Sequence, residues 1–371
     1  MESVLILGAG FGGLEVATRL SGGDFDVTLI DRNDGFTFGF AKFEVLFGRS
    51  TPEQIKLPYS EISKPGVTFK REEIVSIDPT TRRVVTDRAS YDPDVLVVAL
   101  GADYAPDATP GFVEGGYEFY SVAGAGRLGN ALTHFEGGTI LLGVLGVPYK
   151  CPPAPYECLF LMDDYFKERG IVVDFQLVNP MPTPIPPSPQ ASDAIKKAMD
   201  ARNITYTFGQ RVHSIDPSTK TAALGSGASL SYDLFIGIPV HKAPTVVQEA
   251  GLTDGGTDGW IKVDKTNLRT PYDGVWALGD CADAPVPRAG TLAENAARAV
   301  ADDIMGKLDE PYEGRGICFV EFGGGEIGMV HVDFLTGPAP QAPLEGPSRE
   351  LMANKAEFGR DRRQRWFGRS E

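Results

Sequence analysis

A glycine cluster that directly follows a short apolar segment constrains this chain more than any other feature of its sequence. Residues 3–7 are apolar and few, as a buried parallel strand requires. The next residues read Gly8-x-Gly10-x-x-Gly13. Apolar residues then recur at helical spacing, at Leu14, Ala17 and Leu20. Strand, glycine turn and helix in this order predict the first unit of an α/β domain with a parallel sheet.

Each glycine of this turn has a physical task in binding a dinucleotide. The first allows a tight turn, the second lets the backbone approach a pyrophosphate, and the third lets helix and strand pack closely. The helix N-terminus then turns free N–H groups toward the phosphates. Asp31 follows the second strand, residues 27–30, where a carboxylate accepts hydrogen bonds from ribose hydroxyls and repels a 2′-phosphate. FAD or NAD is therefore favoured over NADP, and the alternative is a glycine turn without a ligand. The candidate residues are Gly8, Gly10, Phe11, Gly12, Gly13, Asp31 and Arg32.

Composition narrows the class of protein further. With 371 residues, 42% of them hydrophobic, the chain is long enough for two globular units. Its net charge of −15 argues against nucleic acid as a partner, because phosphate binding needs a basic face. There is no run of about 18 apolar residues, and no basic segment with a cleavage site precedes the first strand. We therefore expect a cytoplasmic protein, with an exported form that has lost its leader as the alternative.

A second strand–glycine–helix unit has lost the pattern that binds a nucleotide. Residues 139–143 read as its strand, 155–169 as its helix and 171–178 as its next strand. In register with Gly143, the second and third glycine positions hold Leu145 and Pro148. Leu145 would place a side chain where a pyrophosphate must approach, and Pro148 lacks a backbone donor. We therefore predict that this unit does not bind NAD(P)H.

Two further segments identify the first dinucleotide as FAD by resemblance. Residues 274–280, which end in Gly279-Asp280, resemble the second FAD motif of the flavoproteins with two dinucleotide-binding domains. Residues 96–101 resemble the middle motif of that family, and the three segments occur in the expected order. The resemblance implies that Asp280 binds the ribityl chain and that the helix predicted over 291–306 points at the flavin. It adds five candidate cofactor residues: Ala99, Gly101, Gly279, Asp280 and Thr291.

The resemblance also implies the domain organisation. We expect an α/β fold with two Rossmann-like dinucleotide-binding domains, as in glutathione reductase, and a short C-terminal extension. The FAD-binding domain is predicted over 1–105 and 255–330, the degenerate second domain over 106–254, and the extension with its basic tail over 331–371.

The chain has four cysteines, and the residues around Cys151 are unusual. No CxxC pair and only four histidines occur, so we predict no metal site. Cys151 lies beside Lys150, and prolines suited to a first helical turn follow it, so we expect a helix N-terminus and a lowered thiol pKa. Cys158 and Cys281 are interpreted as packing residues, and Cys318, in an alternating segment, is compatible with a core strand.

The run Lys150-Cys151-Pro152-Pro153-Ala154-Pro155-Tyr156-Glu157 resembles the cysteine motif of the flavoprotein subunit of flavocytochrome c sulfide dehydrogenase. It is also similar to the equivalent segment of sulfide:quinone oxidoreductases, and the resemblance covers about residues 1–330. It implies that Cys151 and Cys318 are catalytic and form a redox disulfide above FAD. A small sulfur substrate would then be oxidised, with a quinone or a cytochrome c as electron acceptor. Two departures matter: no third cysteine precedes Cys151, and no haem-binding CxxCH occurs, so any cytochrome would be a separate chain.

The C-terminal segment is basic, although the chain as a whole is acidic. Arginines surround Trp366 and Phe367, at positions 360, 362, 363, 365 and 369. Such a segment fits either a peripheral contact with an anionic membrane surface or a tail docked on the protein's own acidic surface.

Three alternatives to a sulfide:quinone oxidoreductase remain at this point. They are a type II NADH:quinone dehydrogenase, a flavocytochrome c-type enzyme with a cytochrome partner, and a non-catalytic flavin-binding regulatory protein. The oligomeric state is also open, with a homodimer as one alternative.

Overall fold

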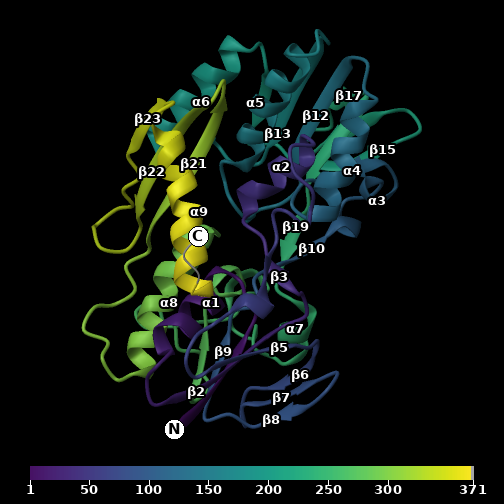
Figure 1. Cartoon of the computed structure of the whole chain (residues 1–371). Helices are drawn as coiled ribbons and strands as arrows, with labels where there is room; N and C mark the ends of the chain where they lie inside the picture. Colours follow the sequence, from purple (N-terminus) through teal and green to yellow (C-terminus); the bar gives the residue numbers. More distant parts are fainter. Residues whose placement is uncertain (369–371) are drawn as a thin grey trace.

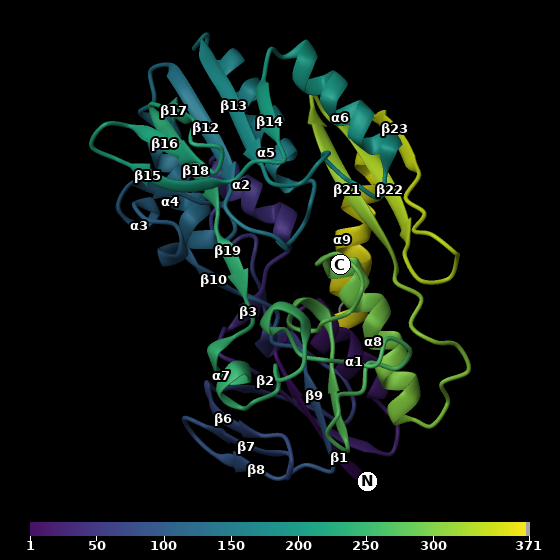
Figure 2. The same ribbon diagram turned by 180° about the vertical axis from the view of Figure 1, so that it is seen from behind.

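The computed structural model describes residues 1–368 and contains two parallel sheets, one in each lobe of the molecule. Figures 1 and 2 show the lobes one above the other, with the chain passing between them more than once. The predicted α/β fold with two Rossmann-like domains is confirmed by this architecture. Among the described residues, no helix is long and apolar enough to cross a membrane.

The first sheet is built around the N-terminal strand. Its five strands are parallel and lie in the order β20-β9-β1-β2-β5. Because β20 comes from late in the sequence, this lobe is discontinuous in the chain. Helix α1 (Phe11–Leu20) packs against helix α8 (Gly290–Ile304) beside the sheet. The strand bounds are β1 Glu2–Leu7, β2 Phe25–Asp31, β5 Val67–Arg71, β9 Val95–Val98 and β20 Val275–Ala277.

The second sheet repeats the parallel arrangement in the order β11-β18-β12-β13-β14. Helix α5 (Ala154–Lys167) follows β12 and is buried along most of its length. Helices α4 (Val122–Thr133) and α6 (Pro189–Ala201) belong to the same lobe. The strand bounds are β11 Gly116–Tyr117, β12 Gly138–Val144, β13 Val173–Asn179, β14 Thr205–Phe208 and β18 Leu234–Ile238.

The C-terminal residues form an antiparallel sheet and a long helix that bridges the two lobes. Strands β21 (Arg315–Gly323), β22 (Glu326–Asp333) and β23 (Leu344–Ser348) pair in that order. Helix α9 (Leu351–Phe367) begins beside this sheet and runs down to α1 and α8, as both views show. The predicted C-terminal extension is therefore continuous with β21, the strand that carries Cys318.

Of the two alternatives for the tail, contact with a membrane surface does not apply to its aromatic residues, which are buried. Trp366 and Phe367 are each only 1% exposed, and Trp366 packs edge-on against Phe11 at 5.2 Å between ring centroids. Arg365 binds the carboxylate of Glu15 on α1 through its Nε, at 2.8 Å. The second interpretation, docking on the protein's own acidic surface, agrees with these contacts. Arg369, which belonged to the same prediction, lies outside the described residues.

Candidate active site

The glycine turn between β1 and α1 has the geometry that its sequence predicts. Gly8 has a φ of +96°, and a Cβ there would lie 2.4 Å from the carbonyl oxygen of Ala99. A Cβ on Gly13 would lie 1.8 Å from the carbonyl oxygen of Gly8, so only glycine lets α1 approach β1 so closely. A Cβ on Gly10, by contrast, would meet nothing within 4 Å. Open space at the start of α1 is what a pyrophosphate needs in order to reach the helix N-terminus.

Asp31 is close to this turn, whereas Arg32 is turned elsewhere. The Asp31 carboxylate accepts a hydrogen bond from the backbone N–H of Ala9 at 2.8 Å, and a second from the N–H of Asn33. Because the side-chain amide of Asn33 also donates to Oδ1, at 2.8 Å, the oxygen that keeps a free lone pair for a ribose hydroxyl is Oδ2, which within residues 1–368 accepts only from Ala9. Arg32 is largely exposed and lies 3.7 Å from Asp103, and it does not line the cavity described next. Gly8, Gly13 and Asp31 do not line that cavity either, so the contact of Arg32 with the cofactor stays a prediction.

A cavity of about 340 Å³ brings together residues from most of the predicted motifs. Its walls come from the glycine turn, from the end of β9, from the segment after β20, from the start of α8, and from both predicted catalytic cysteines. The predicted site residues that line it are Gly10, Phe11, Gly12, Ala99, Gly101, Gly279, Asp280, Thr291, Cys151 and Cys318. The open space before the N-terminus of α1 fits the pyrophosphate of FAD. The largely apolar chamber that continues from it fits the isoalloxazine ring.

Cys151 lies at the cavity wall in the loop before α5. Its φ is +54°, its backbone N–H donates to the carbonyl of Arg288 at 2.9 Å, and its own carbonyl accepts from Ala154 N–H at 2.9 Å. The predicted helix N-terminus is therefore nearby, since α5 begins at Ala154. The predicted lowering of its pKa is wrong: although Cys151 is exposed at the cavity surface, desolvation by the protein around the thiol raises its pKa well above the usual value, and Glu157 and Cys318 raise it further. The Lys150 ammonium binds the Ala102 carbonyl at 3.2 Å and does not offset this burial.

Cys318 lines the same cavity from strand β21, whereas Cys151 lines it from the loop before α5. It lies on β21, paired with Val330 of β22, and both cysteines are free thiols in this structure. Burial raises the pKa of Cys318 to about 12, with a further contribution from Glu157. Cys318 also lines a second, largely apolar cavity of about 330 Å³, whose walls include prolines from residues 148–153 and 184–187. The two predicted catalytic residues, far apart in the sequence, thus lie at one chamber.

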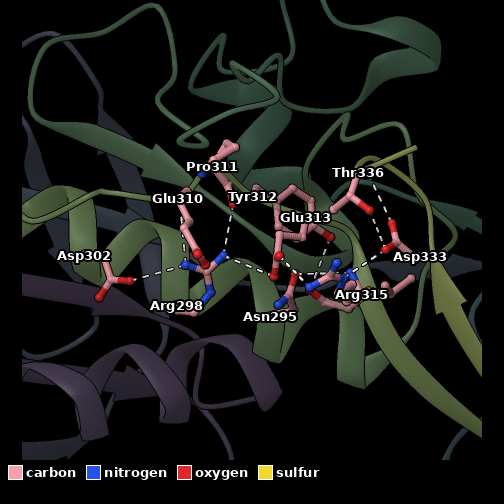
Figure 3. Close-up of polar contacts among 11 residues, drawn as sticks. Asn295, Arg298, Asp302, Glu310, Pro311, Tyr312, Glu313, Arg315, Asp333 and Thr336 are labelled. Atoms are coloured by element: carbon pink, nitrogen blue, oxygen red, sulfur yellow. Dashed lines mark hydrogen bonds and ion pairs between the residues drawn. The ribbon is translucent and has the colours of Figure 1, made fainter. Parts of the chain in front are cut away.

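A network of arginine contacts holds the strand of Cys318 against α8 (Figure 3). Arg315, the first residue of β21, binds Glu313 at 2.7 Å and Asp333 of β22 at 2.9 Å. Arg298 of α8 donates to the carbonyl of Pro311 at 3.0 Å and pairs with Glu313 at 3.5 Å. Because α8 also supplies Thr291 to the cavity, these contacts set the position of β21 relative to the cofactor chamber.

Glu157 is the functional candidate that sequence reasoning missed. It stands in the first turn of α5, is only 4% exposed, and accepts the backbone N–H of Glu321 at 3.1 Å. Burial raises its pKa from 4.5 to about 7, Lys355 lowers it in part, and the nearby Glu321 carboxylate raises it. Its charge in turn raises the pKa of both cavity thiols. The only sequence signal was its place in the run 150–157, six residues after Cys151.

Other cavity residues also carried no recognisable motif. They are aromatic or cationic side chains from segments that the motif analysis left unassigned. The main ones are Phe40, Lys42, Tyr104, Tyr120, Arg288, Lys355 and Phe358.

The remaining cysteines and the degenerate turn behave differently from the active-site residues. Cys158 and Cys281 are both fully buried in hydrophobic cores, so the prediction that they are packing residues is confirmed.

The Leu145 side chain is 1% exposed and packs in a core, so it does not stand where a pyrophosphate would approach, which corrects that expectation. The loop itself differs from a nucleotide turn: residues 145–153, with three prolines, separate β12 from α5, whereas only residues 8–10 separate β1 from α1.

Comparison with known proteins supports the same interpretation. The family described as pyridine nucleotide-disulphide oxidoreductase matches residues 2–140 and 164–301, which is more than half of the chain. The chain belongs to this family. It is an FAD-dependent oxidoreductase. The matched residues do not include 141–163, the interval that contains the loop of Cys151.

Two kinds of enzyme name recur among the individual relatives. The chain is 24% identical over 370 residues to the mitochondrial sulfide:quinone oxidoreductase of Mus musculus, covering 92% of this chain and 80% of the mouse protein. It is also 24% identical to a type II NADH:quinone oxidoreductase of Staphylococcus aureus, covering 84% and 85%. Among solved structures, the sulfide:quinone oxidoreductase of Aquifex aeolicus superposes with a TM-score of 0.84 at 20% identity, covering 99% and 92%. The resemblance inferred from the cysteine motif is confirmed by these relatives.

Proposed function

We propose that this enzyme oxidises sulfide, or a related low-molecular-weight sulfur species, through Cys151 and Cys318 and passes the electrons through FAD to a quinone. The observation that carries the proposal is that both cysteines line the cavity that the dinucleotide turn also lines. The mouse and Aquifex relatives are named for this reaction, which supports the same assignment.

The chemistry starts from the oxidised cysteine pair. Hydrosulfide attacks one sulfur of a Cys151–Cys318 disulfide, a new S–S bond forms there, and the old bond breaks with its electron pair on the other sulfur. We assign the persulfide to Cys151 and the freed thiolate to Cys318. A second hydrosulfide then attacks the outer sulfur of the persulfide and leaves as hydrodisulfide, with the electron pair of the broken bond left on Cys151 as a thiolate. Bound FAD would supply the two-electron acceptor for re-forming the Cys151–Cys318 disulfide from the two thiolates, and would pass these electrons to the quinone. Glu157, with a pKa near neutrality beside both sulfurs, holds the proton that the attacking sulfur gives up.

The cavity walls suit the other reactants of this proposal. Phe40, Phe358 and Lys355 give one end of the cofactor cavity an apolar surface with a single cationic donor, which fits a quinone ring. The second cavity reaches Cys318 without passing through the cofactor chamber and gives a small sulfur substrate its own route. Sulfide and quinone would therefore approach from different sides.

A type II NADH:quinone oxidoreductase is the second candidate, because several relatives carry that name. The proline-containing loop over residues 145–153 argues against it, since it replaces the tight glycine turn that positions a pyrophosphate. A flavocytochrome c-type enzyme would differ from our proposal in its electron acceptor, a cytochrome in place of a quinone. A flavin-binding regulatory protein would differ in having no need of either cysteine.

Anaerobic mixing of the purified flavoprotein with sulfide, and separately with NADH, tests the proposal. We expect sulfide to bleach the flavin absorbance rapidly, and Cys151→Ser and Cys318→Ser each to abolish that bleaching. Cys158→Ser is the matched control, because this cysteine lies on α5 in the core and should leave bleaching unchanged. Bleaching by NADH alone would refute the proposal. Reoxidation by a soluble quinone analogue, with cytochrome c as the comparison, then identifies the acceptor.

We further propose the domain limits 1–105 with 255–330, 106–254 and 331–371, and a cytoplasmic protein that meets the membrane only peripherally. A homodimer is the oligomeric state we would test first, by light scattering of the holoprotein.

A further inference from the structure

Two lysines in the cofactor cavity lack a carboxylate partner. Lys42 begins helix α2 (Lys42–Leu46), and its ammonium donates to the carbonyl of Tyr120. Lys150 donates to the carbonyl of Ala102 at 3.2 Å and lies 4.5 Å from the centroid of the Tyr104 ring. Both line the cavity, and within residues 1–368 neither forms an ion pair within 4.0 Å. An ammonium group taken out of water without a counter-charge is costly, so the cavity is arranged to receive an anion.

The two lysines flank Cys151 through one tyrosine. The Tyr120 carbonyl accepts from Lys42, and the Tyr120 hydroxyl donates to the carbonyl of Lys150 at 2.7 Å, one residue before Cys151. Burial, together with the charge of Lys150, lowers the pKa of Lys42 to about 8, while negative charge on Glu118 or Cys151 acts to raise it. Lys42 therefore remains mostly protonated at neutral pH and interacts electrostatically with the sulfur of Cys151.

The phosphates of FAD do not account for this charge. The open space at Gly10 and the N-terminus of α1 provide the pyrophosphate with its own site. Lys42 interacts electrostatically with Cys151, and Lys150 is the residue that precedes Cys151 in the chain. Of the other cations on the cavity wall, Lys355 is paired with Glu321, and the charge of Asp280 acts on both Lys150 and Arg288. Lys42 is therefore the cation of the cavity that an incoming anion can pair with.

We propose that Lys42, assisted by Lys150, makes this site selective for an anionic sulfur nucleophile, hydrosulfide, over neutral nucleophiles. The inference rests on the proposed function and names the charge state of its substrate. A positive potential in a chamber with low-dielectric walls concentrates anions and raises their encounter rate by about 10- to 1,000-fold. A neutral nucleophile gains nothing from this potential, so loss of Lys42 lowers the rate with hydrosulfide and leaves the rate with a neutral nucleophile unchanged.

The test measures flavin bleaching of the holoprotein at neutral pH in an anaerobic stopped-flow instrument. Hydrosulfide is the anionic nucleophile. Tris(3-hydroxypropyl)phosphine is the neutral one, because it attacks a disulfide through an uncharged phosphorus and frees two thiols. We expect Lys42→Met to lower the second-order rate constant for sulfide by about 10- to 100-fold. The rate with the phosphine should stay within about twofold, because neutral molecules are not concentrated by the potential. Lys42→Arg should restore most of the sulfide rate.

Lys265→Met is the matched control, since it removes the same charge at an exposed position outside the cavity and should change neither rate. An unchanged sulfide rate in Lys42→Met would overturn the inference while leaving the proposed function intact. An equal loss with both reductants would also overturn it, because it would assign Lys42 to the flavin or the fold. If sulfide fails to bleach the wild-type protein, the proposed function and the inference fall together.

Discussion

Replacing Glu157 by glutamine should make the protein more stable and its chemistry slower. Burial raises the pKa of this carboxyl from 4.5 to about 7. At 1.36 kcal/mol per pKa unit, a shift of this size corresponds to about 3 kcal/mol. Because the native state holds the proton more tightly than the unfolded state, stability is highest below the unfolded pKa. It falls as the pH rises toward 7, and above that pH the wild-type protein carries the full cost of the buried charge.

Glu157→Gln removes this cost without removing the hydrogen bond, because the amide oxygen can still accept the N–H of Glu321. Thermal unfolding of the wild-type and Glu157→Gln holoproteins, measured from about pH 5 to about pH 8, should show only a small difference in stability at the acid end. At the alkaline end the variant should be more stable by up to about 3 kcal/mol. In the same variant, bleaching of the flavin by sulfide should slow by about 10²- to 10⁴-fold, the usual contribution of a general base.

Asp163→Asn provides the contrasting control. Asp163 is also buried on α5, yet it has two cationic partners, Lys167 at 2.7 Å and Arg202 at 3.2 Å. Neutralising a paired carboxylate leaves a cation without its partner, so this variant should be less stable at all pH values above the acid range. If Glu157→Gln behaves like Asp163→Asn at alkaline pH, the charge of Glu157 is stabilising where it lies, and our account of its raised pKa is refuted.

Three further variants test the cofactor site and its surroundings. Trp366→Ala removes a fully buried ring that contacts Phe11, so it should cost about 3–5 kcal/mol of stability and accelerate FAD release, measured by flavin fluorescence after dilution. Gly13→Ala should yield flavin-free, destabilised protein, because its Cβ would lie 1.8 Å from Gly8 O, and normal flavin absorbance would contradict this. Gly10→Ala should lower flavin content but keep the melting temperature of the apoprotein, since its Cβ meets no protein atom within 4 Å.

The α/β architecture and the position of the cofactor turn were predictable because their determinants are local. The strand, the glycines and the helix of the first unit lie within residues 2–20, and the close approach that requires glycine at position 13 is to the Gly8 carbonyl of the same turn. The Ala99 carbonyl that crowds Gly8 comes instead from a distant segment. Asp31 is equally local, since it ends the strand adjacent to β1. Motifs of this kind combine short-range periodicity with backbone geometry, which the order of residues alone specifies.

The sequence alone did not decide which surface the C-terminal tail contacts. A segment with arginines around Trp366 and Phe367 fits a membrane surface and a protein surface equally well. Its observed position depends on carboxylates supplied by distant elements, among them Glu15 on α1 for Arg365 and Glu294 on α8 for Arg362. Burial alone would raise the pKa of Glu15, but hydrogen bonds from Arg365 and Trp366 lower it, so this carboxylate keeps its charge at the interface.

The sequence by itself determined that the chain begins with a dinucleotide-binding unit and that Cys151 lies in a loop unlike a nucleotide turn. Only the tertiary structure decided the environment of the cysteines. Lys150 and the start of α5 predicted a lowered pKa for Cys151, whereas burial by several distant segments raises it. Glu157 acquires its unusual pKa in the same way, from the approach of β21 and α9. Burial and electrostatic environment are sums over residues far apart in the chain, and no local pattern encodes such a sum.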